Sequence, residues 1–332
     1  MKTYLALLKP TEPYFFGNEK TFLYPGSEAG GTPNRYFIRS EAVPSQSTVL
    51  GALRYLFLPV KKSDWNYSDA EKKQNEEAVG TSGFEPETEH TYGKISKISP
   101  VFLKNEASIL VPTPLDHMVG NKTYKPFSQY KTVETSDGTQ YYTEEYDTKE
   151  GIASGYLQLS DGAIVEENQI FKRVVRTGIN RTAENKGFFK KEYAMLLEGY
   201  SFGVYVELED DLVPADGIVF LGQGKSAFAI SFREEANCVA EDIKKYLQKD
   251  VAYCWGDLFV SASVYQECYF SVTKTKTYRA YSKWNNRVTK ASTLYKPVAA
   301  GSIFIPKDKE AFKKLAESTN ASRIGYNVWI MN

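Results

Sequence analysis

Histidine is scarce in this sequence, which contains only His90 and His117. Neither residue lies beside a nucleophile motif, so the sequence disfavours a His-based hydrolase and a metal site built from several histidines. Cys238, Cys254 and Cys268 form an odd set without CxxC spacing, which disfavours a disulfide scaffold and a zinc site. We therefore expect reduced thiols, no bound metal and no cofactor.

Net charge and long apolar runs are also lacking. The 41 Lys and Arg residues balance the 41 Asp and Glu residues, so no global basic field attracts nucleic acid. An RNA or DNA partner would have to be held by local patches. No apolar run of about 18 residues or more is present, and the N-terminus has no long apolar segment. We expect a soluble, cytoplasmic protein with no membrane partner.

What the sequence does contain is a mixture of strand and helix patterns, with 42% hydrophobic residues to form a core. Residues 3–9 and 200–208 are typical of strands, whereas residues 46–58 have the spacing of an amphipathic helix. Strands and helices follow one another without regular βαβ alternation, which indicates an α+β fold with antiparallel sheets. The polar, acidic segments near residues 61–90 and 131–150 are typical of insertions.

The stretch PSQSTVLGALRYLF, residues 44–57, joins a buried helical stripe to a small, polar beginning. Free backbone N–H groups, hydroxyls and the helix dipole would favour an anion at this beginning. Arg54, two turns further on, could reach a phosphate or form a surface ion pair. Gly51 would either let RNA or another strand approach the helix or allow tight packing. The candidate anion-binding residues at the helix start are Ser45, Gln46, Ser47 and Thr48.

A glycine-rich stretch, LGQGKSAF at residues 221–228, contains the Gly-Lys-Ser of a Walker A motif. The first glycine of that motif would stand at position 219, where this sequence has Val219, and a strand pattern follows instead of a helix. The sequence therefore disfavours an NTPase. A hairpin turn that a phosphate backbone can approach closely fits better, with Gly222, Gly224 and Lys225 as its candidate residues.

Two segments are locally basic. Residues 172–191 contain seven Lys and Arg residues together with polar and glycine residues, which is typical of a loop that grips an anion. A solvated surface loop is the alternative. The candidates here are Arg176, Asn180, Arg181 and Lys186.

The second basic segment, residues 268–307, contains no acidic residue and interleaves cations with Tyr278, Tyr281, Trp284 and Tyr295. Cations hold phosphates and aromatic faces stack bases, so this pattern favours single-stranded nucleic acid. A sheet edge protected by lysines is the alternative. The candidates in this segment are Lys274, Lys276 and Arg279.

Taken in order, these motifs resemble the RAMP superfamily of CRISPR proteins, and specifically the family of third subunits of the type III-B (Cmr) effector complex. LLKPTEPYFFGNEKTF resembles the first strand and aromatic loop of that family, PSQSTVLGALRYLF its first helix, and VRTGINRTAENKGFF its Arg-and-Gly loop. FLGQGKSAF stands where a Leu-Gly-Gly-type turn is usual, with Gln223 in place of the second glycine. VAAGSIFIP and RIGYNVWI resemble the closing strand and glycine loop, which adds Gly301, Gly325, Tyr326 and Asn327 to the candidates. Sister subunits of type III-A and III-D systems share much of this pattern.

The resemblance implies two ferredoxin-like domains of the RRM type (βαββαβ) with glycine-rich loops and insertions, expected over residues 1–165 and 166–332. It implies a non-catalytic RNA-binding role in antiviral RNA-guided interference. The chain would hold the 5′ repeat-derived tag of crRNA beside the large polymerase/cyclase-like subunit and the backbone subunits. One alternative is a metal-independent, crRNA-processing endoribonuclease of the same superfamily, which would need a Tyr/Lys site here. A tyrosine-rich polysaccharide-binding protein is another.

Overall fold

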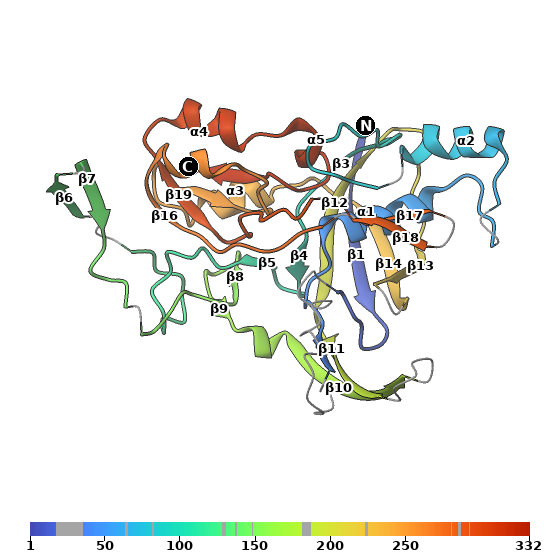
Figure 1. The fold of residues 1–332 in the computed structure, drawn as a ribbon, viewed down its shortest axis with the longest axis horizontal. Coiled ribbons are helices and arrows are strands. Elements are labelled where there is room, and N and C mark those ends of the chain that lie inside the picture. Colours follow the sequence, from blue (N-terminus) through green and yellow to red (C-terminus); the bar gives the residue numbers. More distant parts are fainter. Residues whose placement is uncertain are drawn as a thin grey trace, which may run out of the picture.

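The computed structural model describes residues 1–17, 36–63, 66–81, 83–127, 131–136, 138–147, 149–180, 187–222, 225–279, 281–284, 287–291 and 293–332. Strands dominate these residues, and the helices are few and short (Figure 1). The helices are α1 (Gln46–Phe57), α2 (Asp69–Val79), α3 (Val239–Lys244), α4 (Lys309–Ala316) and α5 (Thr319–Ser322). None of the described helices is long and apolar enough to span a bilayer.

The largest sheet has nine strands, which pair antiparallel throughout. Eight strands follow one another across it, and β3 (Ile95–Ile98) pairs with β12 beside them. The eight are, in order, β13 (Gly217–Leu221), β14 (Ser226–Glu234), β1 (Lys2–Pro10), β12 (Ser201–Leu208), β4 (Phe102–Lys104), β5 (Ile109–Pro112), β8 (Tyr156–Gln158) and β9 (Ile164–Val165). The predicted α+β class with antiparallel sheets is confirmed.

Strand β1 lies in the middle of this sheet, and its side chains alternate between two cores. Tyr4, Ala6 and Leu8 join the core beneath α1, whereas Leu5 joins the core on the opposite face. Both neighbours of β1, β12 and β14, come from the second half of the chain. The domain border expected between residues 165 and 166 stays a prediction.

A second sheet, of four strands, lies beside the first and is covered by α4 (Figure 1). Its order is β16 (Cys268–Val272), β19 (Ile303–Pro306), β15 (Ala252–Cys254) and β20 (Trp329–Met331). Tyr253 of β15 packs in the core that also holds Leu5, so the two sheets share one apolar interior. The more specific assignment of two ferredoxin-like domains stays a prediction.

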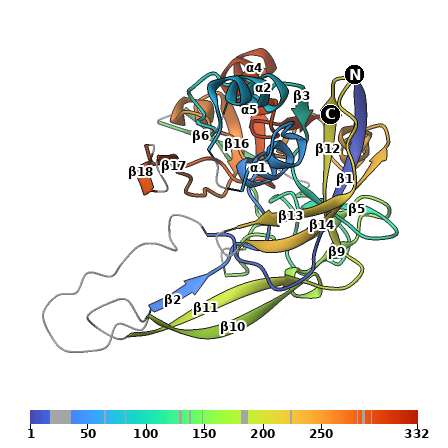
Figure 2. The same ribbon diagram turned by 90° about the vertical axis from the view of Figure 1, so that its right-hand side faces the viewer.

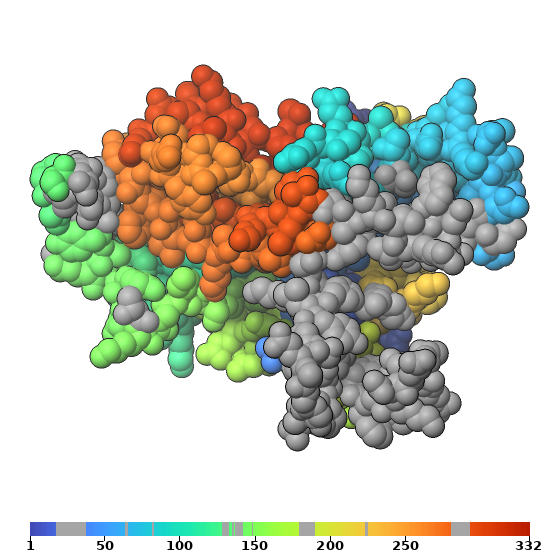
Figure 3. Space-filling view, viewed as in Figure 1, coloured from blue at the N-terminus to red at the C-terminus, as the bar shows by residue number. Residues whose placement is uncertain are grey.

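Three smaller sheets lie outside these two. A long ribbon of β10 (Phe171–Asn180) and β11 (Gly187–Leu196), with β2 (Tyr36–Arg39) parallel to β11, lies below β13 and β14 in Figure 2. The second pairs β17 (Tyr281–Trp284) with β18 (Arg287–Ala291). The third pairs β6 (Lys131–Thr135) with β7 (Gly138–Tyr142), so one expected insertion contains a hairpin where the sequence indicated a loop. The other contains α2, and the two insertions lie at opposite ends of the molecule (Figure 3).

Candidate nucleic-acid interface

The start of α1 has the predicted polar cap and no acidic side chain in its first turn. The expectation of free backbone N–H groups is corrected for Ser47 and Thr48, whose N–H groups already donate hydrogen bonds. The Ser45 hydroxyl accepts a hydrogen bond from the backbone N–H of Thr48 at 3.3 Å. The backbone N–H of Ser47 donates to the hydroxyl of Tyr326 at 3.4 Å. Because no carboxylate compensates the positive end of the helix dipole here, this end favours an anionic ligand.

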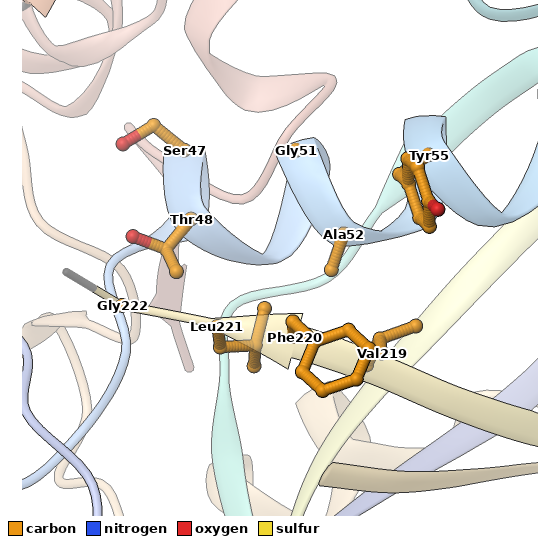
Figure 4. Close-up of a pocket in the computed structure, with 9 residues that line it drawn as sticks. All are labelled: Ser47, Thr48, Gly51, Ala52, Tyr55, Val219, Phe220, Leu221 and Gly222. Carbon is orange, nitrogen blue, oxygen red and sulfur yellow. The ribbon is translucent and has the colours of Figure 1, made fainter. Parts of the chain in front are cut away.

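A groove of 240 Å³ runs between α1 and the edge strand β13 (Figure 4). Its lining residues are Ser47, Thr48, Gly51, Ala52, Tyr55, Val219, Phe220, Leu221 and Gly222. The groove connects the start of α1 to the turn that follows β13.

That turn is a hairpin, because the residues after Lys225 form strand β14. The predicted strand after the Gly-Lys-Ser motif is confirmed. Gly222 has φ +74°, and a Cβ there would lie 2.2 Å from the carbonyl oxygen of Phe15, so only glycine fits. The N–H of Lys225 donates to the carbonyl of Gly222 at 3.1 Å, and Lys225 itself has φ +50°. The turn therefore presents an exposed lysine on a closely packed backbone.

Two cations of the ribbon face each other. Arg176 and Lys191 are direct cross-strand partners in the β10–β11 register. The guanidinium carbon of Arg176 lies 4.9 Å from the ring centroid of Tyr193, and Lys191 Nζ lies 5.2 Å from the same ring and 3.8 Å from that of Phe15. Partial burial lowers the pKa of Lys191. Like charges directly opposite each other destabilise a sheet, and a bound anion would remove that cost.

Phe15 is buried between these parts and contacts two of them. Its ring contacts Lys191, and its carbonyl oxygen lies against Gly222. Gly222 in turn shares the groove with Ser47 and Thr48. We call the surface made by the start of α1, Gly222, Lys225 and the Arg176–Lys191 pair the α1–ribbon surface. Three segments far apart in the sequence, each singled out above, meet there.

Arg54 is not part of this surface, which corrects both expectations for it. Its side chain is buried, and it donates hydrogen bonds from Nε to the carbonyl of Val79 (2.9 Å), from Nη1 to Gly83 (3.0 Å) and from Nη2 to Thr91 (3.1 Å). Burial lowers its pKa to about 10, an effect that the electron-rich Tyr92 nearby opposes. Arg54 holds the loop after α2 onto α1, and so it is removed from the candidates for phosphate contact.

Two candidate cations of the second basic segment, Lys274 and Lys276, are engaged within the chain. Lys274 Nζ donates to the carbonyl of Ala153 at 3.3 Å, and burial lowers the pKa of Lys274. Lys276 Nζ pairs with Asp257 at 3.1 Å, and this pairing raises the pKa of Lys276 although burial acts in the opposite direction. Arg279 is half-buried. An acidic residue outside the segment thus neutralises part of its charge, which the sequence count could not reveal.

One aromatic residue of this segment, Tyr278, also differs from the expectation. Tyr278 packs inside an aromatic cluster with Phe84, Phe259, Tyr295 and Tyr326, at centroid distances of 5.2 Å to Phe259 and 5.9 Å to Tyr326. The ring of Tyr278 therefore packs against other aromatic rings of this chain, which disfavours its use for stacking an RNA base. The side chains of Tyr281 and Trp284 lie outside the described residues.

The candidates from VAAGSIFIP and RIGYNVWI mainly shape the backbone and bond within the chain. Gly301 and Gly325 have φ +92° and +86°, which require glycine. Asn327 is buried, its Oδ1 accepts from the N–H of Phe259 at 2.9 Å, and its Nδ2 donates to the carbonyl of Ala316 at 2.9 Å. Of these four candidates, Tyr326 reaches the α1–ribbon surface, through its bond to Ser47.

Gln46 likewise faces the interior, where its Nε2 donates to the carbonyl of Ser99 at 3.0 Å. Arg181, Lys186, Gly224 and the side chain of Asn180 lie outside the described residues. The candidate list missed Lys191 and Phe220. Lys191 belonged to the basic run, and the strand alternation in GIVFL could have placed Phe220 on an exposed face.

Both histidines are engaged by the backbone. His90 Nε2 accepts from the N–H of Glu85 at 2.8 Å, His117 Nδ1 accepts from the N–H of Lys125 at 2.9 Å, and His117 Nε2 lies 3.0 Å from the carbonyl of Asn121. Burial lowers the pKa of each, so both rings favour the neutral form. Within the described ranges, no three His, Cys, Asp or Glu side chains are grouped to hold a metal ion.

A family model described as CRISPR-associated protein (Cas_Cmr3) matches residues 6–331. The chain belongs to the Cas_Cmr3 family. The sequence resemblance to the RAMP-type Cmr subunits is thereby confirmed, and the chain is a CRISPR-associated protein. A search of the curated proteins gave no match.

Solved structures share the fold of this Cas_Cmr3 family member. A chain in the cryo-EM structure of the type III-B Cmr-beta bound to cognate target RNA aligns with a TM-score of 0.55 at 12% identity, covering 98% of this chain and 96% of that chain. A chain in the same assembly bound to cognate target RNA and AMPPnP, state 1, aligns with a TM-score of 0.50 at 12% identity, covering 98% and 95%.

Proposed function

We propose that this chain is a non-catalytic subunit of a type III-B CRISPR complex that holds the 5′ repeat-derived tag of crRNA on the α1–ribbon surface. The Arg176–Lys191 pair carries the proposal, because two cations fixed opposite each other leave a charge that a phosphate can balance. The acid-free start of α1 and the exposed Lys225 extend the same anion-binding surface.

The proposal includes the protein partners of the complex. The large polymerase/cyclase-like subunit and the backbone subunits would lie around the tag, in keeping with the membership of the Cas_Cmr3 family. The similarity of fold to chains of RNA-bound Cmr-beta assemblies supports this arrangement.

The test compares RNA binding by the full chain and by a charge-reversal variant, Arg176→Glu with Lys191→Glu. The probe is a fluorescent single-stranded RNA of the repeat-derived tag sequence, titrated at several salt concentrations. Each phosphate contact contributes about 0.7 to the salt slope of a single strand, so the variant should lose about 1.4 from the slope together with affinity. Lys73→Glu with Lys314→Glu, on exposed faces of α2 and α4, is the matched control and should change the slope far less.

Equal slopes for the wild type and the Arg176/Lys191 variant would overturn the assignment of the surface. Incubation of the same protein with full-length repeat RNA tests the non-catalytic part of the proposal. Discrete cleavage products that persist with chelator would support the endoribonuclease alternative.

A further inference from the structure

Strand β13 ends the nine-stranded sheet, and on its outer side no strand of the described chain pairs with it. The direction of its hydrogen bonds follows from its neighbour β14. Ala227 accepts from the N–H of Thr11 at 3.0 Å, so the peptide groups of Ala227 point toward β1. In an antiparallel pair the bonded positions alternate, and Ala227 lies opposite Phe220. The N–H and C=O groups of Phe220 and Ile218 therefore point to the free edge.

The sequence of β13 itself contains none of the residues that commonly protect an edge strand against pairing. Exposed edge strands commonly contain a charged residue, a proline or a bulge. The sequence of β13 is GIVFL, and its five residues pair with β14 without a shift in register. Ile218 and Phe220 are each 60% exposed. The strand thus combines unpaired peptide groups with exposed apolar side chains.

The neighbouring wall of the groove leaves room along this edge. Thr48, Ala52 and Tyr55 follow one flank of α1, with Ala52 and Tyr55 extending toward β13 (Figure 4). A Cβ at Gly51 would meet nothing within 4 Å. Glycine is unfavourable in a helix interior, and no close packing inside this chain requires it at position 51. The open space beside Gly51 is therefore available to another molecule.

The chemistry of the groove distinguishes a peptide from RNA. None of its nine lining residues is charged, so the groove itself would not compensate the phosphates of an RNA strand. An extended peptide brings its own N–H and C=O groups, which the free edge of β13 satisfies. Its side chains would alternate between the small residues of α1 and the exposed Ile218 and Phe220.

We propose that the groove between α1 and β13 receives an extended, uncharged segment of another protein subunit of the complex, which adds a strand to β13. The inference rests on the proposed membership of the complex. Ser47, Thr48 and Gly222 at one end of the groove also belong to the α1–ribbon surface, so the peptide segment would lie along Gly51, Ala52 and Phe220, beside the RNA. The inference assigns Gly51 a role in keeping the groove open, and it assigns Phe220 a contact with the partner.

The experiment uses the full chain assembled with the other subunits of its complex. Hydrogen exchange at the Ile218 and Phe220 amides is compared between the free chain and the complex, where added pairing should slow it about tenfold or more. A photoreactive benzophenone side chain in place of Phe220 should cross-link to one segment of one protein subunit. Gly51→Phe should abolish both effects by filling the groove, whereas Lys73→Phe, which puts the same ring on the exposed face of α2, should preserve them. Thermal unfolding of the free Gly51→Phe chain checks that this variant folds.

Three results would overturn the proposal. These are equal exchange of both amides in the free chain and the complex, a cross-link to RNA, and a cross-link to a second copy of this chain. RNA affinity of the free chain is measured separately with the tag oligonucleotide, so failure of the strand addition and failure of the RNA assignment are distinguishable.

Discussion

A Cβ on Gly325 would lie 1.9 Å from Nε2 of Gln46, which places the first residue of α1 directly against the C-terminal loop. The same position would be 2.6 Å from the carbonyl oxygen of Ser99, the group that accepts the hydrogen bond of Gln46. The start of α1 is thus held by the segment around Ser99 and by the C-terminal loop. This contact keeps the Ser47 N–H beside the Tyr326 hydroxyl.

Gly325→Ala should destabilise the protein, because it adds a methyl group at this contact and strains a residue with φ +86°. We expect a loss of about 2–4 kcal/mol in the free energy of unfolding, from left-handed strain and overpacking together. Gly51→Ala is the matched control, since its Cβ meets nothing within 4 Å and alanine favours a helix by about 1 kcal/mol. Denaturant unfolding of both variants should give shifts of opposite sign. Equal shifts would mean that the Gln46–Gly325 contact is not a constraint.

Arg54→Met should reduce stability and leave the salt dependence of RNA binding unchanged. Methionine keeps much of the aliphatic stem but removes the donors to three carbonyl groups, which should cost about 2–4 kcal/mol. Arg54→Lys should lose part of the same free energy of unfolding, because an ammonium group cannot reproduce the planar fork of donors in a guanidinium group. Urea unfolding and the salt titration together check the prediction. A variant of full stability with a shallower salt slope would return Arg54 to the RNA-binding surface.

The sequence predicted local features well and their surroundings poorly. The polar cap of α1 and the hairpin at Gly222 depend on residues within a few positions, so short motifs suffice to predict them. The burial and pairing of the Arg54 and Lys276 side chains depend on partners distant in sequence. These partners include the carbonyl of Thr91 for Arg54 and the carboxylate of Asp257 for Lys276. Basic runs and aromatic spacing contain no information about such partners. The meeting of the ribbon with the turn through Phe15 is a tertiary contact of the same kind.

The carboxyl group of Asp116 should make stability depend on pH. It is fully buried, its Oδ1 accepts from the hydroxyl of Tyr124 at 2.7 Å, and burial raises its pKa to about 6 against the opposing effect of this hydrogen bond. The pKa in the unfolded chain is about 3.9, so the unfolded state releases the proton at lower pH than the folded state. The contribution of this group to stability is therefore fully present below about pH 3.9 and is lost as the pH rises through about 6.

Asp116→Asn should remove this loss while keeping an acceptor for Tyr124. Relative to the wild type, the variant should gain about 2–3 kcal/mol in the free energy of unfolding between pH 4 and about pH 7. Urea unfolding across this range measures the difference. Glu106→Gln, at an exposed carboxylate, should follow the wild-type curve. A difference between Asp116→Asn and the wild type that does not change with pH would show that the buried carboxyl group does not titrate in this range.

Lys225→Gly should separate RNA binding from stability. Lys225 occupies the left-handed region at φ +50°, where glycine is free of the strain that a side chain causes, so the variant should gain about 0.5–1 kcal/mol of stability. It also removes one exposed cation from the α1–ribbon surface, which should lower RNA affinity and reduce the salt slope by about 0.7. Lys225→Asn tolerates the same backbone and serves as the control for loss of charge with a polar side chain retained. A folding defect would lower stability and RNA binding together. A rise in melting temperature with a shallower salt slope would therefore assign the loss of binding to the charge of Lys225. An unchanged salt slope would remove Lys225 from the α1–ribbon surface.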